Sequence, residues 1–231
     1  MNYDALILDA DDTLFDFVQA ESYALTRTFD SFGESIPLDQ YLETFQRINH
    51  RVWRDFEEGR ATIEEIRVRR FVELLEALGL SLDPGEVSDR YIVHLGESDH
   101  MVPGAHEFLE YLEGRLPMVI LTNGLSAVQR SRFAKADVLR YFTDIVISQE
   151  VGIQKPDPEV FRIAAERLGV PDGSRILMIG DSLTSDIDGA LAFGIDACWF
   201  NFRGKPSNPA IQPTFTVTTL PEIYPILGLE P

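Results

Sequence analysis

Two hydrophobic patterns alternate along the chain. One is a short, almost continuously apolar run, which is typical of a strand covered on both faces of a sheet. Six such runs predict strands: Ala5–Leu8, Pro117–Leu121, Asp144–Ile147, Arg175–Ile179, Ala197–Phe200 and Phe215–Val217. The other pattern has helical spacing and begins at Ser126, Asp157 and Thr184. Strands alternating with single helices predict an α/β fold with a doubly wound parallel sheet.

The interval between the first two predicted strands breaks this alternation. It runs from Asp9 to Pro117, far more than the roughly 30 residues of an ordinary βαβ unit. Within it, apolar residues recur at helical spacing in about four segments, and Thr62 with Glu65 has the spacing of a capping box. We therefore expect residues 17–102 to form an all-helical domain. This domain would be inserted into a sheet domain made of residues 1–16 and 103–231.

The charge of the chain limits its partners. The sequence contains 20 Lys and Arg but 38 Asp and Glu, a formal net charge of −18. Such acidity argues against binding to nucleic-acid polymers or membrane surfaces, but is compatible with a small anionic substrate held by a cation. No apolar run approaches the roughly 20 residues of a membrane helix, and the first residues lack the basic region of a signal peptide. We expect a cytoplasmic protein, either a monomer or a small homo-oligomer.

Polar residues that can perform chemistry follow four of the predicted strands. In an open α/β sheet, ligands bind beyond the carboxyl ends of the strands. The candidates there are Asp9, Asp11, Thr122, Asn123, Lys155, Asp181 and Asp186. Each one alone has a simpler interpretation as a helix cap, a turn residue or a solvated lysine. Their ordered occurrence at successive strand ends indicates one common site.

The acidic candidates predict a metal site. Carboxylates gathered at one edge repel one another unless a hard cation lies among them, and Mg²⁺ prefers oxygen ligands together with a substrate phosphate. Lys155 and Thr122 would supply a positive charge and a hydrogen-bond donor for phosphate oxygens. The helix beginning near Ser126 would add backbone N–H groups. Of Asp9 and Asp11, one can be the nucleophile while the other transfers protons.

Four ordered segments carry a family resemblance: Asp9-x-Asp11-x-Thr13, Thr122-Asn123-Gly124, Lys155-Pro156-Asp157-Pro158 and Gly180-Asp181-x₄-Asp186. They resemble the four motifs of the haloacid dehalogenase-like (HAD) hydrolases, which have a Rossmann-like core. The helical insert resembles the cap domain of subclass I of that superfamily.

This resemblance implies a role for each motif residue. Asp9 would become an aspartyl-phosphate, while Asp11 would protonate the leaving oxygen and then activate water. The implied phosphate-binding residues are Thr122, Asn123 and Lys155. The implied Mg²⁺ ligands are Asp9, the backbone carbonyl of Asp11, Asp181 and Asp186. Dehalogenases and phosphonate hydrolases of this superfamily lack an acid at the position of Asp11, whereas phosphatases and mutases have it, so its presence implies phosphate-ester chemistry. Asp12 occupies a position where many members have Gly.

A finer resemblance concerns the substrate. The segments Asp11–Phe15 and Asn49-x₃-Trp53-x₂-Phe56-x₂-Gly59 are similar to those of bacterial pyrimidine 5′-nucleotidases. This implies that a nucleoside monophosphate is the substrate and that Asn49 and Trp53 are its contacts in the cap, although Trp53 fits equally well as cap core. The alternatives are a phosphosugar phosphatase or mutase and, outside enzymes, a phospho-accepting signalling domain or a catalytically silent binding protein.

Overall fold

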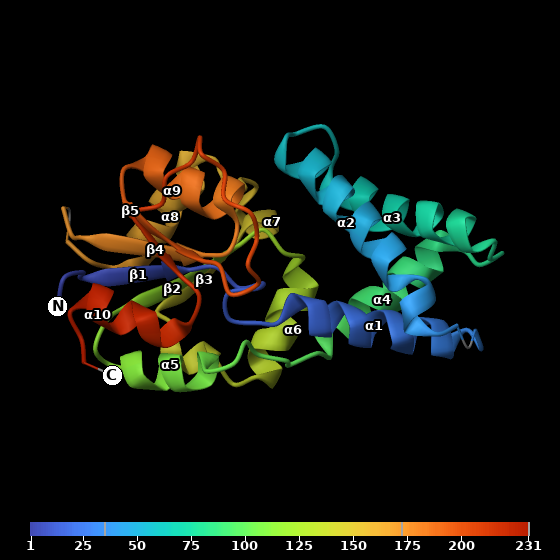
Figure 1. Cartoon of the computed structure of the whole chain (residues 1–231), viewed down its shortest axis with the longest axis horizontal. Helices are drawn as coiled ribbons and strands as arrows, with labels where there is room; N and C mark the ends of the chain where they lie inside the picture. The colour runs from blue at the N-terminus through green and yellow to red at the C-terminus, as the bar shows by residue number, and fades with distance from the viewer. Residues whose placement is uncertain (35, 172, 231) are drawn as a thin grey trace. The chain divides into compact units, whose positions relative to one another are not determined.

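The structure is a computed structural model that describes residues 1–34, 36–171 and 173–230. Its centre is a six-stranded parallel sheet in the order β3-β2-β1-β4-β5-β6 (Figure 1). The strands are β1 (Ala5–Leu8), β2 (Met118–Thr122), β3 (Asp144–Ile147), β4 (Ile176–Gly180), β5 (Asp196–Phe200) and β6 (Phe215–Val217). The predicted doubly wound parallel sheet is confirmed, and β1 lies in its interior.

Helices cover both faces of this sheet, which explains why its strands are apolar along their whole length. Ala5 and Ile7 of β1 belong to a core cluster with α8 (Pro158–Leu168) and α9 (Asp188–Phe193). The alternate residues Leu6 and Leu8 are just as fully buried. On the opposite face lie α5 (Ala105–Leu112) and α10 (Ile223–Leu227), as Figure 1 shows.

Some helices differ from the sequence prediction. The helix at Ser126 is α6 (Ser126–Lys135), as predicted, whereas α5, α10 and the short α7 (Ser148–Val151) were not predicted. The helix expected from Thr184 begins with a π-helical turn, η3 (Leu183–Ile187), before α9. Ser182 accounts for this start, because its hydroxyl accepts a hydrogen bond from the backbone N–H of Ser185. The Ser182 N–H in turn donates to the Asp186 carboxylate.

Besides α5, the described residues between β1 and β2 form four longer helices: α1 (Phe17–Ser31), α2 (Leu42–Glu57), α3 (Ile63–Leu78) and α4 (Pro84–Gly96). The predicted capping box at the start of α3 is present, with Thr62 and Glu65 bonded to each other's backbone. The aromatic rings of Phe45, Phe71 and Tyr91 pack together from α2, α3 and α4. The four helical segments predicted from spacing are therefore confirmed.

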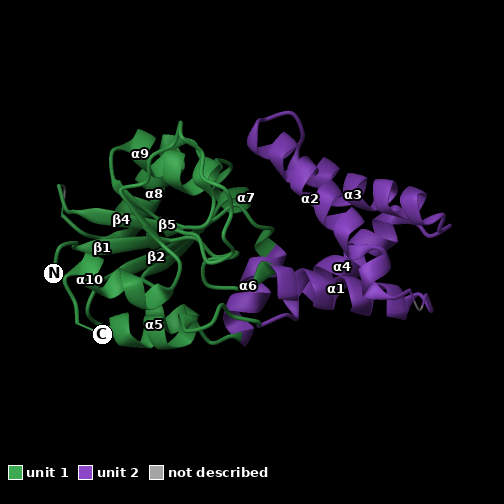
Figure 2. Cartoon of the chain, viewed as in Figure 1, with its two compact units in different colours: residues 1–17, 100–126, 136–231 green, residues 18–99, 127–135 purple. Residues whose placement is uncertain are grey.

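The chain divides into two compact units (Figure 2). The core unit comprises Met1–Phe17, His100–Ser126 and Ala136–Pro231. The helical unit comprises Val18–Asp99 and Ala127–Lys135, so most of α6 groups with the inserted helices rather than with the sheet. No described helix is long and apolar enough to cross a membrane.

Candidate active site

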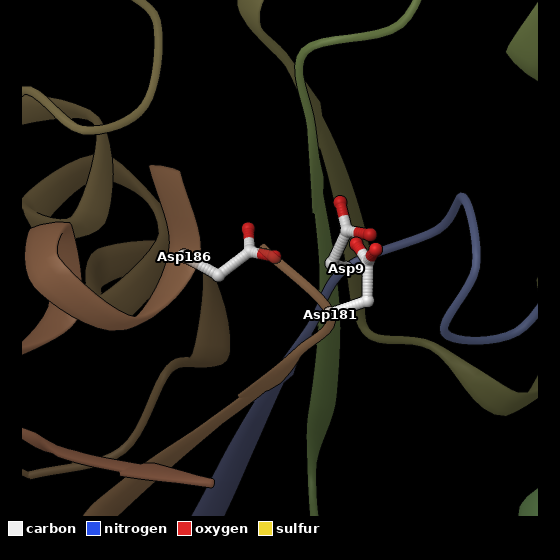
Figure 3. Close-up of side chains that lie close together, drawn as sticks. All are labelled: Asp9, Asp181 and Asp186. Atoms are coloured by element: carbon white, nitrogen blue, oxygen red, sulfur yellow. The ribbon is translucent and has the colours of Figure 1, made fainter. Parts of the chain in front are cut away.

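Three carboxylates converge at the carboxyl edge of the sheet. Asp9 directly follows β1 and Asp181 directly follows β4, and these strands are hydrogen-bonded neighbours. Asp186 reaches toward both from η3 (Figure 3). Each of the three offers an oxygen, and these oxygens lie within 4.8 Å of one another. Two adjacent strands and one helical turn thus bring Asp9 together with two carboxylates that are far from it in the sequence.

Gly180 makes room for this arrangement. A Cβ atom at this position would lie 2.3 Å from Asp186 Oδ2 and 2.5 Å from its Cγ. Only a residue without a side chain lets the Asp186 carboxylate lie against the end of β4. The glycine before Asp181 therefore has a steric role in the site.

Lys155 is the central cation of the cluster. It lies in the connection between α7 and α8, and only 2% of its side chain is exposed. Its ammonium donates to Asp9 Oδ1 at 2.6 Å, to Asp186 Oδ1 at 2.6 Å and to the Leu121 carbonyl at 2.9 Å. All three donors of the ammonium are thus used. Lys155 links the ends of β1 and β2 to η3.

The protonation of the cluster follows from its burial. Burial raises the pKa of the Asp9 carboxyl well above its ordinary value; the charges of Asp186 and Asp181 raise it further, and Lys155 opposes them. Burial also raises the pKa of Asp181 to about 7, although the ammonium of Lys205 opposes the shift. Burial lowers the pKa of Lys155, but the attraction of Asp186 and Asp9 outweighs it, so that this pKa is raised.

The donor set fits a hard divalent cation. Asp9, Asp181 and Asp186 offer carboxylate oxygens, the ligands that Mg²⁺ prefers. When all three are ionised, they face two ammonium groups, since Lys205 pairs with Asp181 and Lys155 with the other two carboxylates. The remaining negative charge of the cluster would repel the phosphate of a substrate unless a cation neutralised it. The chemistry of the residues therefore agrees with the predicted magnesium site.

Thr122 and Asn123 end β2 beside this cluster. The Thr122 hydroxyl is buried and accepts a hydrogen bond from the Gly124 N–H at 3.1 Å. The Asn123 carbonyl oxygen accepts from the Lys155 N–H at 2.9 Å, and its amide donates to the Lys155 carbonyl at 3.0 Å. Asn123 thus anchors the backbone that carries Lys155. Its contact with phosphate stays a prediction.

Asp11 lies in a tight turn after β1. The N–H groups of Leu14 and Phe15 both donate to the Ala10 carbonyl, which closes this turn. Asp11 is part-buried, and its carboxylate is not one of the three that cluster among the described residues. Thr13, fully buried in the same turn, donates to Asp9 Oδ2 at 3.3 Å. The turn therefore holds one carboxylate in the cluster and another, Asp11, next to it in sequence.

The two cap candidates lie in the helical unit. Asn49 is buried, its amide donates to Glu21 at 3.0 Å, and its carbonyl oxygen accepts from Arg70 at 3.0 Å. Asn49 thereby joins α1, α2 and α3. Trp53 is part-buried, with its ring packed edge-on against Phe56. These contacts give Asn49 a structural function; substrate contact by Asn49 or Trp53 stays a prediction.

Two cations of the core unit escaped the sequence analysis. Lys205 pairs with Asp181, and Arg203 pairs with Asp12 and Asp16. Both follow β5 in a polar stretch that has no periodicity and no motif. The sequence indicates only that the acidic residues near the site need cationic partners; it does not indicate which cations supply them.

Comparison with known proteins agrees with this geometry. A family model described as haloacid dehalogenase-like hydrolase matches residues 3–194. The chain belongs to this family. The resemblance seen in the four motifs is thereby confirmed, and the protein is a hydrolase.

Individual relatives of this HAD-like hydrolase cover nearly its whole length. It is 37% identical to the putative HAD-hydrolase YfnB of Bacillus subtilis, over 99% of this chain and 97% of that protein. It is 34% identical to pyrimidine 5′-nucleotidase YjjG of Escherichia coli, with 98% of this chain and 99% of YjjG covered. Pyrimidine 5′-nucleotidase PynA of Streptococcus pneumoniae is 31% identical over 98% of this chain and 96% of PynA.

A solved structure extends this similarity to the fold. The crystal structure of YfnB bound to magnesium matches this structure with a TM-score of 0.91 at 36% identity. The match covers 98% of this chain and 99% of YfnB. A relative with the same fold thus binds the cation that the acidic cluster fits.

Proposed function

We propose that this hydrolase is a magnesium-dependent phosphatase that acts on small phosphate monoesters through a phosphorylated Asp9. The observation that carries the proposal is the cluster of Asp9, Asp181 and Asp186, in which the buried Asp9 and Asp186 both contact the Lys155 ammonium. Carboxylates that can hold a cation, one of which can act as the nucleophile toward phosphorus, are what phosphoryl transfer through an acyl phosphate requires.

The chemical step divides between two aspartates. An oxygen of Asp9 attacks phosphorus, the bond from phosphorus to the ester oxygen breaks, and Asp11 gives its proton to that leaving oxygen. Asp11 then takes a proton from water, which attacks the phosphorylated Asp9 and releases inorganic phosphate. Lys155 supplies positive charge and Thr122 a hydroxyl donor for the phosphoryl oxygens during both displacements. Mg²⁺ would be held by Asp9, the Asp11 carbonyl, Asp181 and Asp186, and would neutralise the phosphate charge.

The proposed substrate class is the nucleoside 5′-monophosphates. Its support is the similarity over the full length to two pyrimidine 5′-nucleotidases, YjjG and PynA. Trp53, with an aromatic ring that is part-buried in the helical unit, is the proposed contact for the base. A phosphosugar phosphatase or mutase is the alternative that the same core chemistry allows.

A phosphate-release assay tests the activity. Nucleoside 5′-monophosphates and sugar phosphates are compared at equal concentration, with Mg²⁺ and after chelation by EDTA. We expect release from the nucleotides only with Mg²⁺, and at least about a 10³-fold loss in Asp9→Asn, because an amide is a poor nucleophile. Asp188→Asn, an exposed aspartate two residues beyond Asp186, is the matched control. Turnover that persists in EDTA or in Asp9→Asn refutes the proposal; preference for sugar phosphates refutes only the substrate class.

The role of Asp11 has a separate prediction. In Asp11→Asn, hydrolysis of a nucleotide is expected to fall about 10²–10⁴-fold, the usual contribution of a general acid or base. Formation of the phosphorylated enzyme from p-nitrophenyl phosphate should fall far less, because nitrophenolate leaves without a proton. Rapid-quench measurement of phosphoenzyme formation compares the two substrates. Equal losses for both would show that Asp11 is not the general acid.

A further inference from the structure

A short turn after β5 carries a cation that contacts the segment following Asp11. The guanidinium of Arg203 donates to Asp12 Oδ1 at 2.9 Å and to Asp16 Oδ1 at 2.5 Å. The Asp12 and Asp16 side chains are only 13% and 8% exposed, so this double ion pair is largely shielded from water. Arg203 lies 187 residues from Asp16 in sequence but joins both ends of the Asp12–Asp16 segment.

Asp12 has a side chain although its backbone conformation favours glycine. Its φ is +58°, in the left-handed region that favours glycine. The resemblance to HAD hydrolases places Gly here in many members, which is consistent with that φ. In this chain the position has a carboxylate instead, and its Oδ1 also accepts a hydrogen bond from the Phe17 N–H at 3.1 Å. The strained backbone is thus accompanied by two contacts that glycine could not make.

The other end of the segment is fixed as well. The Asp16 N–H donates to the His100 carbonyl at 3.0 Å, and the Val102 N–H donates to the Leu14 carbonyl at 2.9 Å. With these bonds and its pair to Arg203, Asp16 is held on both its backbone and its side chain. The turn that carries Asp11 is therefore bounded by anchored residues.

Arg203 is itself held in place. Its guanidinium lies 4.5 Å from the centre of the Phe202 ring, and this ring stacks on Phe200, the last residue of β5, with centroids 5.3 Å apart. Asn201 closes the turn, because its side chain accepts from the Lys205 N–H and donates to the Lys205 carbonyl. A cation fixed in this way can define the position of the carboxylates that it binds.

We propose that Arg203 is a positioning residue: by bridging Asp12 and Asp16, it holds Asp11 where it can transfer a proton to the leaving oxygen. The inference rests on the proposed function, since it assigns Arg203 to the general-acid step of that reaction. A displacement of about 1 Å in a reacting group can cost about 10²-fold in rate. The group affected would be Asp11, with the nucleophile Asp9 retained by Lys155 and Thr13.

The test compares Arg203→Met, Arg203→Lys and Asp12→Gly with the wild type on a nucleotide and on p-nitrophenyl phosphate. We expect Arg203→Met to lower kcat about 10- to 100-fold on the nucleotide but less than about 3-fold for phosphoenzyme formation from the aryl phosphate. Arg203→Lys should lie between, because it keeps the positive charge on a shorter side chain, whereas the Nη2 atom of Arg203 contacts both carboxylates. Asp12→Gly suits the backbone and should reproduce the selective loss. Arg167→Met, which removes an exposed arginine paired with Asp144 in the same unit, is the control.

The possible results distinguish a failure of the Arg203 proposal from a failure of the proposed phosphatase activity. Calorimetric titration gives the Mg²⁺ concentration that saturates each variant, because the Asp11 carbonyl is itself a proposed ligand. The two substrates are then compared at that concentration. If both substrates lose rate equally at saturating Mg²⁺, or if neither rate changes, Arg203 does not position Asp11. If Arg203→Met fails to fold, Arg203→Lys and Asp12→Gly still decide between these results. A wild-type protein that hydrolyses neither substrate refutes the proposed function itself.

Discussion

Lys155 shows why a buried cation is retained at this site. Two carboxylates within 2.6 Å of its ammonium would otherwise be left in the interior without a counter-charge. Breaking a buried ion pair by removing one partner costs about 3–5 kcal/mol, because the other charge is left unpaired. In the proposed reaction the same ammonium would also face the phosphate, so one substitution of Lys155 would remove both its structural role and its proposed binding role.

Unlike the charged ammonium of Lys155, the buried thiol of Cys198 is neutral and is expected to be unreactive. Cys198 is fully buried in β5, and burial, followed by the charge of Glu222, raises the pKa of its thiol to about 12. The neutral thiol is the form that the folded state favours. Its contribution to stability is therefore full below the ordinary thiol pKa and is lost as the pH rises toward 12.

We predict that iodoacetamide at pH 8 leaves Cys198 unmodified in the native protein and modifies it fully in guanidinium chloride. At that pH roughly one thiol in 10⁴ is ionised when the pKa is about 12, and only the thiolate reacts. Mass spectrometry gives an unambiguous result, since Cys198 is the only cysteine in the chain. Rapid labelling of the native protein would mean that β5 opens readily to solvent.

Individual site residues differ in how far the sequence could predict them. Asp9, Asp181 and Lys155 follow buried strands or their connections, and parallel strands bring their carboxyl ends to one edge, so their proximity was predictable. The contacts of Asn123 with the Lys155 backbone were not, because they depend on the conformation of a loop. Arg203 and Lys205 gave no signal either: a cation in an irregular turn has no pattern that fixes its partners.

At the scale of elements, the end of β4 packs directly against η3, because Gly180 lies against the Asp186 carboxylate. Gly180→Ala would place a methyl group on the Asp186 carboxylate, so that Asp186 must move away from Lys155. We expect a loss of about 1–3 kcal/mol in the free energy of unfolding, the usual cost of overpacking. Urea denaturation of the protein measures it.

Gly85→Ala provides the control for that substitution. Gly85 lies in the first turn of α4, where an added Cβ meets only the flexible carboxylate of Asp83, at 3.0 Å. Alanine should be close to neutral or stabilising there, because glycine costs about 0.5–1 kcal/mol within a helix. If Gly180→Ala were as stable as Gly85→Ala, the packing of Asp186 against β4 would be looser than the structure shows.

Elements with a regular pattern were predictable and irregular ones were not. Runs such as Ala5–Leu8 and Asp144–Ile147 are apolar because helices cover both faces of the sheet, so their bounds agree with the structure. The helix α5 was missed because its eight residues give barely two turns of periodicity. The π-helical turn at Leu183–Ile187 depends on side-chain bonds of Ser182 and Asp186, which spacing does not reveal.

For the whole molecule, the acidic cluster predicts that magnesium stabilises the folded state. A ligand at about 100 times its Kd adds about 2.7 kcal/mol, which for a chain of this size raises Tm by about 5–10 °C. The shift should disappear in Asp181→Asn and remain in Asp188→Asn. NaCl at the same ionic strength separates binding from general screening of the net charge of −18.

The two tryptophans allow this shift to be assigned to one unit. Trp53 belongs to the helical unit, whereas Trp199 belongs to the core unit and its indole donates to the Asp181 carbonyl at 2.9 Å. In Trp53→Phe, the fluorescence of Trp199 reports unfolding next to the predicted metal ligands. A magnesium effect absent from that signal would place the cation elsewhere in the molecule.

The interior position of β1 has a consequence for how the protein is made. β1 is synthesised first, but its partners are residues 118–120 of β2 and 176–179 of β4. At about 5–20 residues per second, the ribosome delivers β4 on the order of 10–30 seconds after β1. During that time the β4-facing edge of this apolar strand is unpaired, and an unpaired edge can pair with another chain and start aggregation. A nascent chain released before β4 emerges therefore lacks the strand that pairs with β1 and also lacks Asp181, so we expect it to have no activity.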